Sequence, residues 1–293
     1  MTQNIHLAKQ PLSRRPFSGI GVQVDCFLYD ETNQEAGVTA EDLALYERRL
    51  AALRPGAARI FLAISDFNPS FDAKTYDWNR PGFQRQLAGL KRLDNLGVPV
   101  MSPWTNDQMR QEGMEVTAVD LVEHLIRAEG LTNLQWLTLF NEPDSLYYHD
   151  SPLYTRLFGE QACENRPPWA AYVEKHKQTQ RLLEARQLYP DVKLVVGDTT
   201  WGYAMRKERV AMAARDFAGL DVSYSCHNYI VDWPEFYDDS PDFASPGMAE
   251  EARIFRHMVG ENAELIAWEF NNAGVGFGVA FPGVNQYGED LIG

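Results

Sequence analysis

Two glutamates each follow an intensely apolar segment, and this placement suits acid/base or nucleophilic chemistry. Glu142 comes just after residues 137–140, and Glu269 comes just after residues 265–268. Continuous apolar runs of this kind are typical of strands buried on both faces, so each carboxylate should stand where a strand leaves the core. Carboxylates in such positions carry proton transfer and covalent catalysis. The alternative for each is a carboxylate in an ordinary turn or salt bridge.

Other polar and aromatic side chains also follow apolar runs along the chain. They include carboxylates, amides and rings, and no Gly-x-Ser-x-Gly motif accompanies them. In order of the segments they follow, they are Asp25; Asp66 and Asn68; Trp104, Asn106 and Asp107; Asn141; Asp198 and Trp201; His227, Asn228 and Tyr229; and Asn271.

The elements that must position these residues alternate from end to end. Apolar periodicity predicts strands at 19–24, 58–64, 98–102, 134–140, 192–196, 221–225 and 264–269. Helical patterns lie between them, the first capped by Thr39 with Asp42, the second opened by Pro81, and the third begun by Thr117 with Asp120. Further helices are predicted at 169–188, 207–217 and 248–259.

This alternation predicts a parallel α/β fold in one domain over residues 1–293, with residues 1–17 as an N-terminal extension. A (β/α)8 TIM barrel fits best, although its eighth unit is missing or atypical, since 279–284 contains Pro282 and Gly283. A doubly wound sheet stays open, but no Gly-rich phosphate motif follows the first strand. In a barrel, strands four and seven face each other across the mouth, so Glu142 and Glu269 can converge.

Composition excludes some partners. The net charge of −14 argues against nucleic acid and anionic membranes, which need basic surface. No apolar run reaches the ~20 residues of a membrane helix, and residues 1–17 lack a secretory signal. We therefore expect a cytoplasmic protein, or a secreted one expressed without its leader. The three cysteines are too widely spaced for a metal cluster, and the oligomeric state stays open.

The chain resembles the retaining glycoside hydrolases of clan A, and it is most similar to the family 5, cellulase-like branch, with family 39 a neighbour. The resemblance spans roughly residues 19 to 275 and rests on Asn141-Glu142-Pro143, His227-Asn228-Tyr229, Glu269 and Arg59. Two positions depart from the pattern. Residues 103–106 stand where many family 5 members carry a histidine, and the usual aromatic of the eighth strand has no clear match.

The resemblance implies that Glu142 is the acid/base and Glu269 the nucleophile. It further implies that Asn141 binds the sugar 2-hydroxyl, and that Arg59 lies under Glu269 and keeps it ionised. Tyr229 would donate to Glu269, while His227 would line the site or orient Glu142.

Aromatic residues in the predicted loops suit sugar binding, since pyranose C–H faces stack on rings. Trp104, Trp201 and Trp233 are the candidates, and residues 145–168 and 232–245 are predicted to be long loops that wall the cleft. Trp136 is expected in the core. Further candidates for substrate binding are Asp25 and Asn106.

The leading hypothesis is a retaining β-glycosidase acting on a β-glucan, a β-mannan or a smaller β-glycoside, with no metal or organic cofactor. Its partner would be an oligo- or polysaccharide. A catalytically weak carbohydrate-binding barrel is the first alternative, because the eighth unit is atypical. A metal-dependent barrel enzyme is the second, although the chain lacks a His-x-His motif at the strand ends.

Overall fold

A computed structural model describes residues 21–24, 31–72, 75–97, 100–102, 109–200, 202–229 and 248–271. Its centre is a seven-stranded sheet in which every neighbouring pair is parallel and the strands follow one another in sequence order. The strands are β1 (Val22–Val24), β2 (Ala58–Ile60), β3 (Val100–Ser102), β4 (Leu134–Thr138), β5 (Lys193–Thr199), β6 (Ser223–Tyr229) and β7 (Glu264–Asn271).

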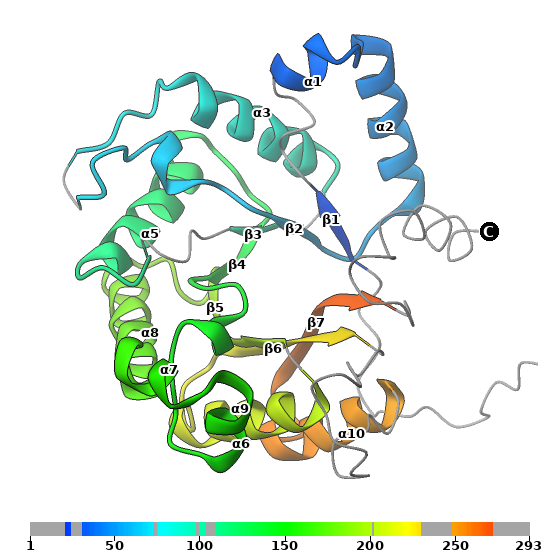
Figure 1. The fold of residues 1–293 in the computed structure, drawn as a ribbon. Coiled ribbons are helices and arrows are strands. Elements are labelled where there is room, and N and C mark those ends of the chain that lie inside the picture. Colours follow the sequence, from blue (N-terminus) through cyan, green and yellow to red (C-terminus); the bar gives the residue numbers. More distant parts are fainter. Residues whose placement is uncertain are drawn as a thin grey trace, which may run out of the picture.

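The helices lie outside the curved sheet (Figure 1). Helix α3 packs on β3, α8 and α9 pack on β5, and α10 packs on β7. Their bounds, with the remaining helices, are α1 (Glu31–Glu35), α2 (Ala40–Leu53), α3 (Pro81–Asn95), α5 (Met114–Glu123), α6 (Pro152–Phe158), α7 (Glu160–Asn165), α8 (Trp169–Ala185), α9 (Tyr203–Asp216) and α10 (Met248–Val259). No helix among the described residues has the length and apolar character needed to cross a membrane.

The protein is thus an α/β fold with a parallel sheet, as predicted. Within the described residues β1 and β7 are the two edges of the sheet, so seven strands of the predicted barrel are present without the closing one. The predicted eighth unit at 279–284 and the N-terminal extension at 1–17 lie outside the described residues.

The strands form where the chain is continuously apolar, because both faces of the sheet are covered. In β5, Leu194, Val195 and Val196 are completely buried, and Leu137 of β4 is buried with them. Trp136, expected in the core, is only half-buried, since its indole N–H donates to Glu264 at 2.9 Å. Aromatic N–H groups usually find such a partner.

Helix α2 begins as predicted, with Thr39 and Asp42 in a reciprocal capping box. The predicted start of the third helix is wrong. Helix α5 begins at Met114, and Thr117 lies buried within it, with its hydroxyl on the Met114 sulfur. Gly113 precedes the helix with φ of 84°, so a left-handed glycine, rather than a Thr–Asp cap, sets its start.

The prediction of a long loop at 145–168 is also wrong. A 3-10 turn (Pro143–Ser145) and helices α6 and α7 occupy most of this segment. Ser151 caps α6 by accepting the Tyr154 amide at 3.0 Å, and Tyr154 packs with Ala162 and Met205 in a small core of its own. Helices this short show little periodicity in a sequence, which is why the pattern missed them.

Candidate active site

The described structure brings four predicted site residues to one region of the sheet: Arg59 on β2, Asn141 and Glu142 after β4, and His227 on β6. For Glu269 and Tyr229 it describes the backbone strands alone. Asp25, Trp104, Asn106 and Trp201 lie outside the described residues, as do Trp233 and the predicted loop at 232–245.

Glu142 stands at a strained turn four residues after the end of β4. Its backbone is left-handed, with φ of 51° and ψ of 59°, although a residue before proline favours extended conformations. Its N–H donates to the Asp198 carbonyl at 3.1 Å, which ties the end of β4 to the end of β5. Its side chain is 35% exposed, so it meets solvent where the side chains behind it do not. Strained non-glycine residues of this kind concentrate at functional sites.

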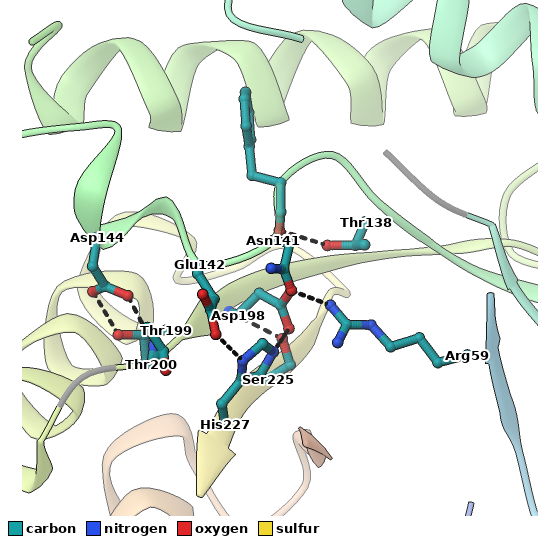
Figure 2. A network of polar contacts seen from close by, with 12 residues as sticks. Arg59, Thr138, Asn141, Glu142, Asp144, Asp198, Thr199, Thr200, Ser225 and His227 are labelled. Carbon is teal, nitrogen blue, oxygen red and sulfur yellow. Dashed lines mark hydrogen bonds and ion pairs between the residues drawn. The ribbon is translucent and has the colours of Figure 1, made fainter. Parts of the chain in front are cut away.

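His227 connects Glu142 to a buried carboxylate (Figure 2). The imidazole is fully buried, with Nδ1 at 3.0 Å from Glu142 Oε1 and Nε2 at 3.2 Å from Asp198 Oδ1. An ionised carboxylate only accepts hydrogen bonds, so we assign a hydrogen to Nε2. One further proton then lies between Nδ1 and Glu142, carried by one group or the other. The imidazole can therefore exchange a proton with Glu142 without moving.

Asp198 holds this arrangement in place, and it was not among the predicted site residues. Its carboxylate pairs with Arg59 at 2.9 Å and accepts the Ser225 hydroxyl at 2.9 Å. Burial raises the pKa of Asp198, but the charge of Arg59 and the contacts with His227 and Ser225 lower it by more. The pKa therefore lies below its usual value. The available signal was its position just after the apolar run at 192–196, since Asp198 is among the polar residues that follow such runs.

Arg59 contacts two residues of this network, both of which are buried or half-buried. Besides Asp198 it donates to the Asn141 side-chain oxygen at 2.6 Å. This bond fixes the amide orientation, so the nitrogen of Asn141 points away from the guanidinium (Figure 2). The predicted contact of Arg59 with Glu269 involves a side chain that the structure does not describe, and it stays a prediction.

The pairing of β6 with β7 places the backbone of Glu269 beside that of His227, at the end of the sheet where the other site residues lie. In the pairing of β6 with β7, His227 lies opposite Glu269 and Tyr229 lies opposite Asn271. The register shifts between Cys226 and His227, immediately before these pairs. The backbone of Glu269 is thus the neighbour of the residue whose imidazole contacts Glu142. Such irregularities are often found beside active sites, where they re-aim a side chain.

The arrangement can move protons and hold charge. It offers one partly exposed carboxylate, an imidazole in contact with it, and a buried ion pair beneath. Among the described residues no group of three or more His, Cys, Asp or Glu side chains is arranged to hold a metal ion.

Comparison with known proteins gives matches at the level of structure only. No protein-family model matches the chain, and no curated protein matches it. An exo-β-1,4-mannosidase from Opitutaceae bacterium strain TAV5 is 15% identical with a TM-score of 0.45, over 90% of this chain and 54% of that one. A GH10 endoxylanase from a sugarcane soil metagenome is 12% identical with a TM-score of 0.39, over 90% and 88%.

The bacterial orthologue of human α-L-iduronidase is 15% identical with a TM-score of 0.42. The alignment covers 75% of this chain but spans only 35% of the length of the orthologue. Because all three TM-scores are below 0.5, we base the proposed function on the residues of the site.

Proposed function

We propose that this protein is a retaining glycoside hydrolase that cleaves β-glycosidic bonds, with Glu142 as acid/base and Glu269 as nucleophile. The observation that carries the proposal is the contact of Glu142 with His227, the residue that lies opposite Glu269 in the sheet. Two carboxylate residues then belong to one edge of the sheet, one held by an imidazole. Paired carboxylates about 5–5.5 Å apart support double displacement at an anomeric carbon.

In the first step Glu269 attacks the anomeric carbon, and Glu142 gives its proton to the leaving oxygen. The glycosidic bond breaks, and the sugar stays as an ester on Glu269. In the second step Glu142, now a carboxylate, takes a proton from water, and the water oxygen displaces Glu269. The sugar is released with its original configuration, and Glu142 regains its proton.

The neighbours of Glu142 suit this cycle. The Nδ1 atom of His227 stabilises either protonation state of Glu142, because it accepts a proton or donates one. Asp198 keeps the imidazole in one orientation, and Arg59 neutralises the charge of Asp198. Asn141, oriented by Arg59, is the candidate to hydrogen-bond the sugar 2-hydroxyl, a contact that strengthens in the transition state.

The proposed substrate class is a β-glucan, a β-mannan or a smaller β-glycoside. Helices α6 and α7 follow Glu142 closely in the chain, so we infer that they form one side of the cleft. We further propose that the sugar stacks on Trp104 and Trp201, and that Tyr229 donates a hydrogen bond to Glu269.

The decisive experiment replaces Glu269 with Ala and assays aryl β-glucosides and β-mannosides with and without azide. Turnover should be lost, and azide should restore it in part by attacking the face opposite the leaving group, which yields an α-glycosyl azide. In the matched Glu142→Ala variant, azide instead attacks the intermediate and yields the β-glycosyl azide. Unchanged activity of Glu269→Ala would refute the nucleophile assignment. Oligosaccharide binding by the wild-type protein without any turnover would favour the carbohydrate-binding alternative.

A further inference from the structure

Three contacts tie the turn that carries Glu142 to the end of β5. The Glu142 amide donates to the Asp198 carbonyl at 3.1 Å. Two residues further on, Asp144 accepts the Thr199 hydroxyl at 2.6 Å with one oxygen and the Thr200 amide at 2.8 Å with the other. Asp144 is completely buried, so these two bonds, which Figure 2 draws, are shielded from water.

We call these bonds of Asp144 the anchor, and Arg209 of α9 also contacts Asp144. Its Nε lies 3.4 Å from Asp144 Oδ1, and another guanidinium nitrogen donates to the Tyr147 carbonyl at 2.7 Å. The guanidinium also lies over the Trp169 ring, 4.6 Å from its centroid. Arg209 is completely buried, and a charge at such depth is stable only beside a partner of opposite sign. Asp144 is the carboxylate that the geometry places there.

The anchor has a physical task at Glu142. A left-handed residue before proline is strained, and it persists only where its surroundings over-determine it. The bonds of Asp144 supply that determination from the far side of Pro143. Without them, the turn would be free to relax to negative φ, and this would move the Glu142 carboxyl away from His227.

We propose that Asp144, charge-balanced by Arg209, is a positioning residue that holds Glu142 in its left-handed turn and thereby aims the proton donor. The inference rests on the proposed function, because it assigns Asp144 to the proton-donating half of that reaction. Because Asp144 is completely buried, it acts on Glu142 through the backbone of Pro143 and not by contact with the substrate.

Leaving groups distinguish positioning from mere stability. A phenyl glycoside needs a proton on its leaving oxygen, whereas a dinitrophenyl glycoside departs without one, so misplacing the acid harms only the first. Asp144→Asn should lose about tenfold or more in kcat/KM on phenyl β-glucoside or β-mannoside and less than about threefold on the dinitrophenyl analogue. Thr199→Val removes one bond to Asp144 with little change in volume, so it should show the same pattern more weakly. This variant provides the test if Asp144→Asn fails to fold.

The matched control is Glu251→Gln. Glu251 lies on α10, is as buried as Asp144 and pairs with Arg206, which lies one turn before Arg209 on α9. Its loss should change kcat/KM equally on both substrates. If Asp144→Asn behaves like this control while Glu142→Gln shows the leaving-group dependence, the positioning role is refuted and the proposed function stands. If the wild-type protein cleaves neither glycoside, the proposed function fails.

Crystal structures then test the positioning on their own. A negative φ at residue 142 in Asp144→Asn, beside a left-handed one in the wild type and in Glu251→Gln, supports it. An unchanged left-handed residue 142 in Asp144→Asn overturns it.

Discussion

Two buried carboxylate–guanidinium pairs in this molecule have similar geometry, but only one of them is connected to a solvent-exposed carboxylate. Arg59 with Asp198 and Arg206 with Glu251 have closest N–O distances of 2.9 and 2.7 Å, and all four side chains are almost completely buried. Arg206 grips Glu251 with two nitrogens and joins α9 to α10. Asp198 instead contacts His227, which in turn contacts the carboxylate of Glu142, and that side chain is 35% exposed.

Burial and ion pairing are common to both pairs, so neither property marks a functional site by itself. The distinguishing feature is the connection from Asp198 to a solvent-facing acid at the carboxyl end of a strand, where α/β folds place their chemistry. We therefore expect mutations along the first connection to affect rate, and mutations of the second pair to affect stability.

The largest expected effect is that of Glu142→Gln on rate. Removing the proton donor should lower kcat/KM on phenyl β-glycosides by about 10²–10⁴-fold. Stability should change little, because the side chain is partly exposed and the amide keeps its size. Steady-state kinetics measures the loss in kcat/KM, and urea unfolding of the same preparation measures the stability. A variant that unfolds early but, when folded, turns over normally would show that this carboxylate is structural.

Glu251→Gln should give the reverse result. Removing the charge of Glu251 breaks a buried ion pair, which costs about 3–5 kcal/mol in the free energy of unfolding. The neighbouring Glu250→Gln is the control, because Glu250 pairs with Arg253 in solvent and should leave the urea midpoint unchanged. Equal midpoints for the two variants would contradict the contrast, as would a selective loss of rate in Glu251→Gln.

Much of this fold could be predicted, because local patterns encode it. Helix α10 (Met248–Val259) has the predicted bounds, and the Thr39 cap and the Pro81 start of α3 are as predicted. The alternation of strands and helices predicts parallel pairing but leaves the strand order open, and the observed sequential order agrees with the barrel hypothesis rather than with a doubly wound sheet. The departures are local: a left-handed Gly113 starts α5, and short helices lie where a loop was predicted.

The site was only partly predictable. The resemblance pointed to Glu142 and His227 and gave orientation of Glu142 as one of two roles for His227, although the two residues are 85 positions apart in the chain. Asp198 escaped selection because its partners Arg59, Ser225 and His227 come from other strands, and nothing in its own neighbourhood announces them. Sequence spacing indicates which residues reach an edge of the sheet. It does not say which of them will be paired beneath it.

The smallest expected effect is the pH dependence of the stability that the Arg59–Asp198 pair provides. The pKa of Asp198 is lowered in the folded protein, so its pairing adds stability above the unfolded pKa of about 4, and this stability is lost as pH falls through the folded pKa. Asp198→Asn lacks this titration. The wild-type advantage in unfolding free energy should therefore be constant above about pH 5 and shrink below about pH 4, by at most about 1.4 kcal/mol per pH unit. Urea unfolding from pH 7 to pH 3 measures it. A gap that widens on acidification would mean that Asp198 is protonated in the folded state, and Arg59 would then be balanced by another group.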